Sequence, residues 1–78
     1  MQLGRVRLSE VFMCEIIELP VWSKLHSLNE GVLYYSFNPE QVEKETFTIL
    51  WVSVGKDVPK GFQFLSPSDD GCYFWKIT

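Results

Sequence analysis

The side chains that could do acid–base or nucleophilic chemistry are few and poorly placed for it. The chain has one histidine, His26, and two cysteines, Cys14 and Cys72. A nucleophilic triad needs a base beside the nucleophile, and nothing in the spacing brings His26 to a thiol, so we expect a solvated or hydrogen-bonded strand histidine. Glu15 and Glu18 lie three positions apart in an expected strand, so they point to opposite faces and cannot share one substrate. No glycine-rich phosphate loop occurs. We therefore expect that the protein is not an enzyme.

The two cysteines lack the spacing of a metal-binding or redox motif. A disulfide between Cys14 and Cys72 would close a long loop and add about 4 kcal/mol. In a cytosolic chain, however, two buried free thiols that pack as small apolar side chains are the expected state. Two thiolates and the imidazole of His26 are an incomplete ligand set for a metal ion. We expect no metal and no cofactor.

The charge balance is acidic. Ten Asp and Glu outnumber seven Lys and Arg, which gives a formal charge of −3. An acidic domain does not attract a phosphate backbone, so we expect no direct binding to nucleic acid. Arg5 and Arg7, at strand spacing, form the only local basic pair. No apolar stretch approaches the roughly 18 residues of a membrane span, and the first residues do not resemble a signal peptide. We expect a cytoplasmic protein with no membrane partner.

Alternating and β-branched patterns predict an all-β chain. The expected strands cover residues 3–8, 11–19, 22–28, 32–37, 46–54, 62–65 and 71–78, and turn residues separate them at close intervals. Helical periodicity is absent, although Asn38-Pro39 could open a brief helix instead of the exposed loop that we prefer for residues 38–45. The predicted fold is a small antiparallel barrel or sandwich of about six to seven short strands, in a single compact domain spanning residues 1–78.

Some details of this arrangement follow from local chemistry. Residues 3–8 and 11–19 are expected to form a hairpin through a loop near Ser9-Glu10. Residues 46–54 are almost wholly β-branched or aromatic, which predicts the centre of a sheet. Residues 71–78 are apolar on both faces, which predicts a central or interface-buried strand. Gly31 and Gly71 are expected in the turns that precede two of the strands.

Aromatic residues make up 15% of the chain, which is rich for a small soluble domain. Most of them are expected to pack in the core, because a base-stacking platform comes with a basic groove that the sequence does not reveal. The surplus predicts a homo-oligomer or a stable partner complex, and Tyr73 and Trp75 are the candidates for self-association. Trp22 follows Pro20 at an expected turn, where an exposed aromatic would anchor an interface.

Short motifs spread over most of the chain, from about Val6 to its end, form a recognisable set: Leu19-Pro20, Lys24-Leu25-His26-Ser27, Gly31-Val32-Leu33, Asn38-Pro39-Glu40, Phe47-Thr48-Ile49, Val54-Gly55, Val58-Pro59-Lys60-Gly61-Phe62 and Asp70-Gly71-Cys72-Tyr73-Phe74-Trp75. Together they resemble a family of small, uncharacterised bacteriophage and prophage proteins. The resemblance implies a phage origin and a compact β fold, and it brings no catalytic residues. Two departures from the family pattern, Trp22-Ser23 in place of Gly-Ala and His26 in place of an apolar residue, put any shared surface function at that corner in doubt.

These observations favour a phage-type accessory protein that binds and inhibits a host protein, such as a bacterial defence component of the CRISPR type. An acidic β domain can occupy a basic nucleic-acid channel. Trp22 is the expected anchor, and the expected charged contacts are Glu40, Glu43, Glu45, Asp69 and Asp70. One alternative is an oligomer that sequesters a nucleotide signal where Arg5, Arg7 or Lys76 meets stacked aromatics. The other alternative is a structural or assembly protein of the phage particle.

Overall fold

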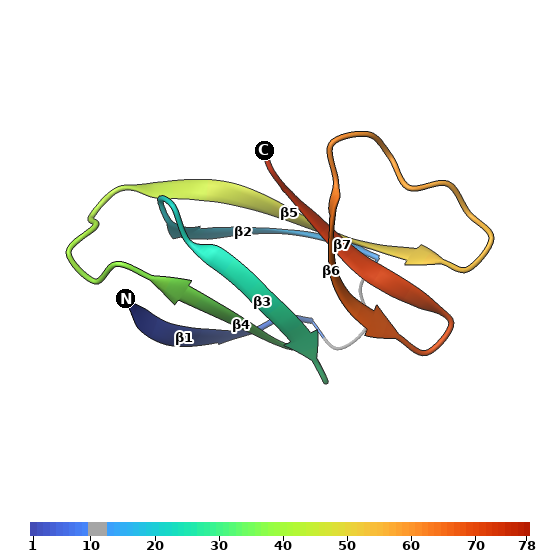
Figure 1. Ribbon diagram of the computed structural model, residues 1–78, viewed down its shortest axis with the longest axis horizontal. Coiled ribbons are helices and arrows are strands. Elements are labelled where there is room, and N and C mark those ends of the chain that lie inside the picture. The colour runs from blue at the N-terminus through green and yellow to red at the C-terminus, as the bar shows by residue number, and fades with distance from the viewer. Residues whose placement is uncertain (10–12) are drawn as a thin grey trace.

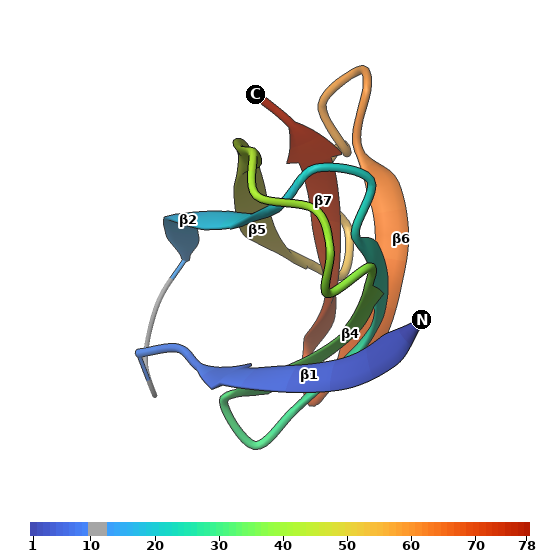
Figure 2. The same ribbon diagram turned by 90° about the vertical axis from the view of Figure 1, so that its left-hand side faces the viewer.

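Seven antiparallel strands form two sheets in the computed structural model, which describes residues 1–9 and 13–78 (Figure 1). The strands are β1 (Gln2–Arg7), β2 (Cys14–Pro20), β3 (Lys24–Asn29), β4 (Val32–Phe37), β5 (Lys44–Ser53), β6 (Gln63–Ser68) and β7 (Gly71–Ile77). One sheet has the order β1-β4-β3 and the other the order β2-β5-β7-β6. The all-β prediction is confirmed, and of the two predicted architectures the chain adopts the sandwich, because the two sheets face each other and do not close into one barrel (Figure 2).

The tight turns explain where the hairpins form. Glu30 and Gly31 both have positive φ, 53° and 80°, which is the backbone that a two-residue hairpin loop requires. The turn joins β3 to β4 and also accepts a bond from the chain after β1, since the amide of Leu8 donates to the carbonyl of Gly31 at 2.7 Å. Asp69 and Asp70 make the turn between β6 and β7. Both predicted turns are confirmed, except that Gly71 lies just after its turn, as the first residue of β7.

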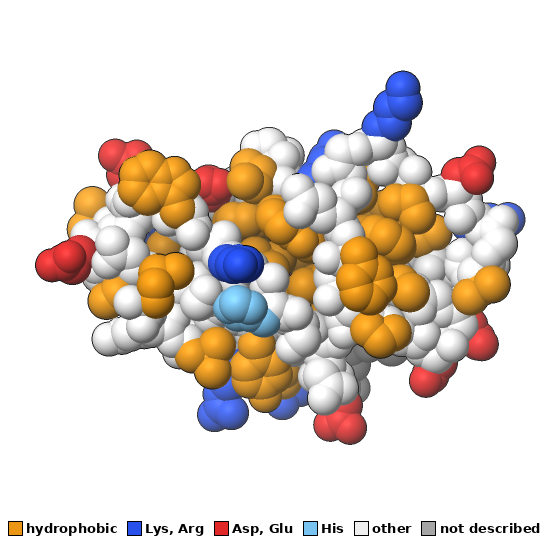
Figure 3. All heavy atoms as spheres, viewed as in Figure 1, with side chains coloured by type: hydrophobic (Ala, Val, Ile, Leu, Met, Phe, Trp, Pro, Cys, Tyr) orange, Lys and Arg blue, Asp and Glu red, His pale blue; other side chains and the backbone are white. Residues whose placement is uncertain are grey.

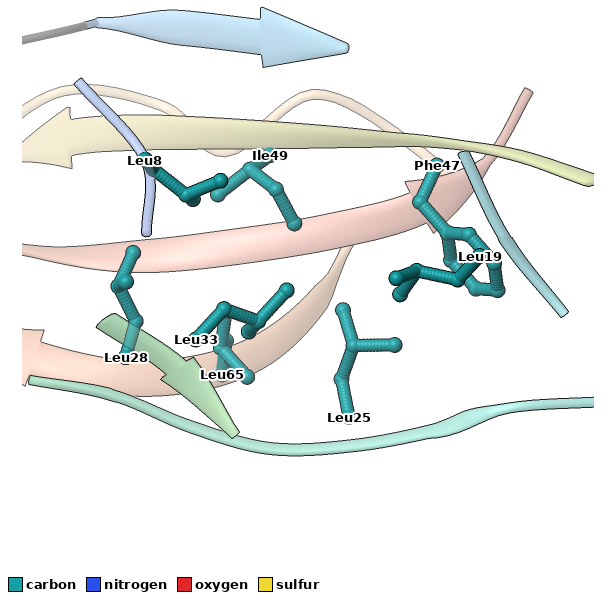
Figure 4. Close-up of a cluster of buried hydrophobic side chains, with 8 residues drawn as sticks. All are labelled: Leu8, Leu19, Leu25, Leu28, Leu33, Phe47, Ile49 and Leu65. Carbon is teal, nitrogen blue, oxygen red and sulfur yellow. The ribbon is translucent and has the colours of Figure 1, made fainter. Parts of the chain in front are cut away.

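The core lies between the two sheets. Phe47, Ile49 and Leu33 are fully buried, and Figure 4 shows them with side chains from the facing strands. Trp75 packs beside Phe47 with 5.9 Å between the ring centroids. The eight buried apolar side chains are Leu8, Leu19, Leu25, Leu28, Leu33, Phe47, Ile49 and Leu65. Each sheet therefore has one inner face that is covered and one outer face that is not.

The strands formed by residues 46–54 and 71–78 were expected inside a sheet, and both lie inside the four-stranded sheet. β5 lies between β2 and β7, and β7 lies between β5 and β6. β2 and β6 are edge strands, and each contains a proline, Pro20 or Pro67. A proline is tolerated at an edge because no second neighbour needs its missing amide hydrogen. For that reason β6 continues to Ser68, past the predicted end at residue 65, with an irregularity between Phe64 and Ser66.

The predicted hairpin of residues 3–8 and 11–19 is wrong. β1 pairs with β4 and β2 pairs with β5, so the two segments belong to different sheets. Ser9-Glu10 lacks the Gly or Asn that a tight hairpin turn requires, and alternation alone does not identify the partner of a strand. The expectation for residues 10–12 lies outside the described residues. Residues 38–43 form a loop with a turn at Pro39-Glu40, as preferred.

Candidate protein-interaction site

The turn between β2 and β3 holds Trp22 away from the body of the protein. The amide of Ser23 donates to the carbonyl of Pro20 at 3.1 Å, and the Ser23 hydroxyl donates to the same carbonyl at 2.6 Å. Trp22 has a φ of 68°, a left-handed conformation that costs a residue with a Cβ about 1–2 kcal/mol. Its side chain is 77% exposed. The expected exposure of Trp22 is confirmed, and two hydrogen bonds fix the turn that presents it.

The acidic loop between β4 and β5 lies beside this turn. The amide of Val21 donates to the carbonyl of Glu43 at 2.9 Å and so ties the two connections together. Within the loop, the Asn38 carboxamide oxygen accepts a bond from the Glu40 amide at 3.0 Å. Glu40 and Glu43 are exposed. Both connections lie at the same end of the molecule in the two perpendicular views (Figures 1 and 2).

Sequence reasoning missed one member of this group, Val42, which is 87% exposed. It is the single apolar residue in a polar stretch, and that contrast was a usable signal. We call the group of Trp22, Glu40, Val42 and Glu43 the Trp22 end. Glu45, the third predicted carboxylate, is half-buried near the start of β5, where it pairs with Leu19. The structure thus places two of the three predicted glutamates in the loop that is hydrogen-bonded to the Trp22 turn.

Asp69 and Asp70 belong to a different part of the surface. They are exposed in the turn between β6 and β7, toward the other end of a molecule that is 41 Å long (Figure 1). An open hollow of about 600 Å³ separates this turn from the β3–β4 turn, and Glu30, Asp69 and Tyr73 are among its lining residues. Figure 3 shows acidic side chains toward both ends of the long axis. The two acidic groups therefore form separate patches toward opposite ends of the molecule.

Tyr73 and Trp75 lie on the inner face of β7, where they pack against the buried core. Their predicted role in self-association stays a prediction, but the outward positions of the same sheet belong to other residues. Cys14, Leu50, Phe74 and Phe64 stand opposite one another across all four strands. We call these four residues the outer row. Phe64 is 59% exposed and meets Phe74 edge to face, with 6.0 Å between centroids.

The expectation of two buried thiols is wrong. Cys14 is exposed and Cys72 is half-buried, and both are free. Cys14 lies on β2 and Cys72 on β7, and these strands flank β5 on opposite sides. The backbones of β2 and β7 are therefore about 10 Å apart, which is beyond the reach of a disulfide. Cys14 and Cys72 were expected in the core because free cysteine is among the most buried residue types, but both positions alternate with the inward residues of their strands.

His26 makes the hydrogen bond expected of a strand histidine. Its Nε2 lies 2.9 Å from the Ser36 hydroxyl on the neighbouring strand. Among residues 1–9 and 13–78, no group of three His, Cys, Asp or Glu side chains is arranged to hold a metal ion. The same part of the chain has no helix that is long and apolar enough to cross a membrane.

Comparison of the chain with protein-family models, with curated proteins and with solved structures gives no match.

Proposed function

We propose that the chain is a non-enzymatic, phage-type accessory protein that binds a host protein through the Trp22 end and inhibits it in the bacterial cytoplasm. The observation that carries the proposal is the exposure of Trp22 in a left-handed turn that two hydrogen bonds hold in place. Strain of this kind persists where the surrounding structure enforces it, and it concentrates at binding sites. The resemblance to small bacteriophage proteins supports the same class of function.

The chemistry of the Trp22 end defines the partner surface. A tryptophan and a valine beside two glutamates fit an apolar pocket bordered by Lys or Arg. Proteins that hold nucleic acid have such basic surfaces, and a CRISPR effector of a bacterial defence system is the partner that we favour. The rigid turn lowers the entropy lost on binding, and the glutamates increase the rate of encounter.

The test compares single variants in a plasmid-clearance assay with a bacterium whose CRISPR effector destroys a target plasmid. Expression of the unmodified chain is expected to preserve the plasmid, and Trp22→Ala to restore clearance. Truncation of a buried interface anchor costs about 2 kcal/mol or more, which is roughly a 30-fold loss of affinity. Val54→Ala is the control, because it shortens an apolar side chain of similar exposure, 83%, on a different surface.

Two results would reject the proposal. If Trp22→Ala protects the plasmid as well as the unmodified chain does, Trp22 is not the anchor. If the plasmid is cleared in the presence of the unmodified chain, the CRISPR effector is not the partner. In that case a pull-down from host lysate with the immobilised chain at low salt tests for other host partners. If no host protein is retained in stoichiometric amount, inhibition by binding is rejected altogether.

Self-association is favoured by a separate observation, the outer row. Four neighbouring strands each contribute one apolar side chain to it, and none of the four is charged. A second copy offers the same uncharged row, so two sheets can pack face to face about 10 Å apart around a twofold axis. We propose a dimer formed in this way.

Light scattering after size exclusion tests the dimer. Phe64→Lys is expected to yield a monomer, while Leu3→Lys, at a position 70% exposed on the other sheet, is the control and should leave the mass unchanged. A monomeric unmodified chain would refute the dimer. Open-ended assembly would refute it too and would instead favour the structural role in a phage particle.

A further inference from the structure

The three-stranded sheet has a charge opposite to that of the whole chain. β1, β3 and β4 contain Arg5, Arg7 and Lys24, and none of the ten carboxylates falls within these strands. The chain as a whole carries a formal charge of −3. Three of the seven Lys and Arg are therefore gathered in one sheet whose strands contain no carboxylate, because strands distant in sequence come together there.

The three cations share the outer face of this sheet. Val6 packs against the core, so its neighbours Arg5 and Arg7 point outward by alternation, and both are exposed. On β3, Leu25 is buried and Lys24 is exposed. A groove of about 250 Å³ is lined by Arg5, Arg7 and Val32. The basic side chains thus line the two outer strands of one face.

An aromatic ring lies between these cations. Tyr35 packs against the core, so Tyr34 points outward from the central strand β4. Arg5 stands directly opposite Tyr34 on β1. His26, bonded to Ser36 of β4, adds a second ring over the same face. Figure 3 shows Lys or Arg and His side chains over the middle of β3 and no acidic side chain there.

We propose that this basic face, formed by Arg5, Arg7, Lys24, His26 and Tyr34, binds single-stranded nucleic acid. Arg5 and Arg7 are two residues apart on one strand, so their backbones are about 7 Å apart, a spacing that suits neighbouring phosphates of an extended single strand. Lys24 lies two strands away, about 10 Å across the sheet. Tyr34 is half-buried, and its ring faces outward between the cations. Cations on both sides of an outward-facing aromatic ring are the combination that holds a phosphate backbone while a base stacks.

The negative total charge does not prevent this contact. Salt limits the reach of an exposed charge to about 8 Å at physiological ionic strength, so the local face decides whether a phosphate is attracted. Glu30, in the β3–β4 turn, is the carboxylate closest in sequence to the strands of this face. A Cβ on the adjacent Gly31 would lie 3.9 Å from a guanidinium nitrogen of Arg7, so Glu30 borders the Arg7 side of the face.

Fluorescence anisotropy of the purified chain with a labelled oligothymidine of about 12 nucleotides tests the proposal. At about 20 mM salt we expect saturable binding, and three phosphate contacts predict that log K falls with log salt at a slope of about −2. The double variant Arg5→Glu with Arg7→Glu is expected to weaken binding at least ten-fold. Glu30→Gln is expected to strengthen it, and Tyr34→Ala to weaken it roughly ten-fold through lost stacking.

The matched control is Lys56→Glu with Lys60→Glu. It makes the same change in net charge in exposed residues of the loop between β5 and β6, and it should leave the affinity within about two-fold if local charge decides. Circular dichroism establishes that each variant remains folded. An equal loss in the control pair would show that net charge alone matters and would overturn the assignment, as would the absence of saturable binding.

Competition with thymidine monophosphate distinguishes two ligands that both carry a phosphate and a base, a single strand and a small nucleotide. Weak competition, at concentrations far above those of the oligonucleotide, supports a single strand that spans several cations. Competition at equal concentration would assign the face to a small nucleotide and overturn the single-strand proposal. Trp22→Ala is expected to leave oligonucleotide binding unchanged, so this test is independent of the proposed inhibition of a host protein.

Discussion

Gly71 is the position where one added methyl group should reveal how closely β7 approaches β5. It is buried at the start of β7 and pairs with Ser53. A Cβ built there would overlap the carbonyl oxygen of Val52 and would lie 2.9 Å from both the Ser53 Cα and the Trp51 ring. Two of these three neighbours are backbone atoms of β5, which cannot move aside without disturbing the ladder between β5 and β7.

We expect Gly71→Ala to destabilise the fold by about 2–3 kcal/mol, at the upper range of overpacking effects. A chain of this size has a total stability of about 4–12 kcal/mol, so the variant loses a large fraction of it. The melting temperature should fall by roughly 10–20 °C, because 1 kcal/mol shifts a domain of this size by about 4–8 °C.

Urea unfolding followed by tryptophan fluorescence measures the effect, with Gly61→Ala as the comparison. Gly61 has a φ of 88° and open space around it, so an added methyl there meets no neighbour and costs only the backbone strain of about 1–2 kcal/mol. A Gly71→Ala variant as stable as the unmodified chain would refute the close approach of β7 to β5. A larger loss at Gly61 than at Gly71 would show that backbone strain outweighs the steric contact.

Three further predictions concern single features of the fold. Deletion of residues 74–78 should unfold the domain, because β7 pairs with both β5 and β6 and the Thr78 amide donates to the Thr46 carbonyl at 2.9 Å; a truncated chain with a β-sheet circular dichroism spectrum would contradict this. Iodoacetamide should label Cys14 much faster than Cys72 in the native chain, and mass spectrometry after mild oxidation should find no intramolecular disulfide. Trp22→Gly should be about 1 kcal/mol more stable than Trp22→Ala in thermal unfolding, the reverse of the usual order, because glycine accepts a φ of 68° without strain; the usual order would mean that the turn is not left-handed.

The sequence carried enough information to predict the class of fold and most strand positions. β-branched and aromatic residues located β5 and placed it inside a sheet, and apolar residues on both faces did the same for β7. Glycine and aspartate located the two tight turns. These features depend on residues close together in the chain, which is why pattern and propensity identify them.

Pairing between distant strands was beyond such reasoning. Strand β1 pairs with β4 and not with the next strand along the chain, and the alternation of residues 3–8 is compatible with either partner. The same limit hid the environment of Cys14, whose exposure depends on its register opposite Leu50. The basic face could not be predicted for the same reason, because Arg5 and Lys24 share one sheet face only when β1 and β3 both pair with β4.

The three candidate surfaces lie on separate parts of a very small domain, so substitutions on them should act independently. The Trp22 end belongs to two loops, the outer row to the four-stranded sheet and the basic face to the three-stranded sheet. Residues more than about 7–10 Å apart that share no partner usually have additive effects. Trp22→Ala, Phe64→Lys and Arg5→Glu should therefore each remove one interaction and leave the other two intact. Loss of two interactions from one of these substitutions, in a chain that stays folded, would mean that a single ligand spans both surfaces.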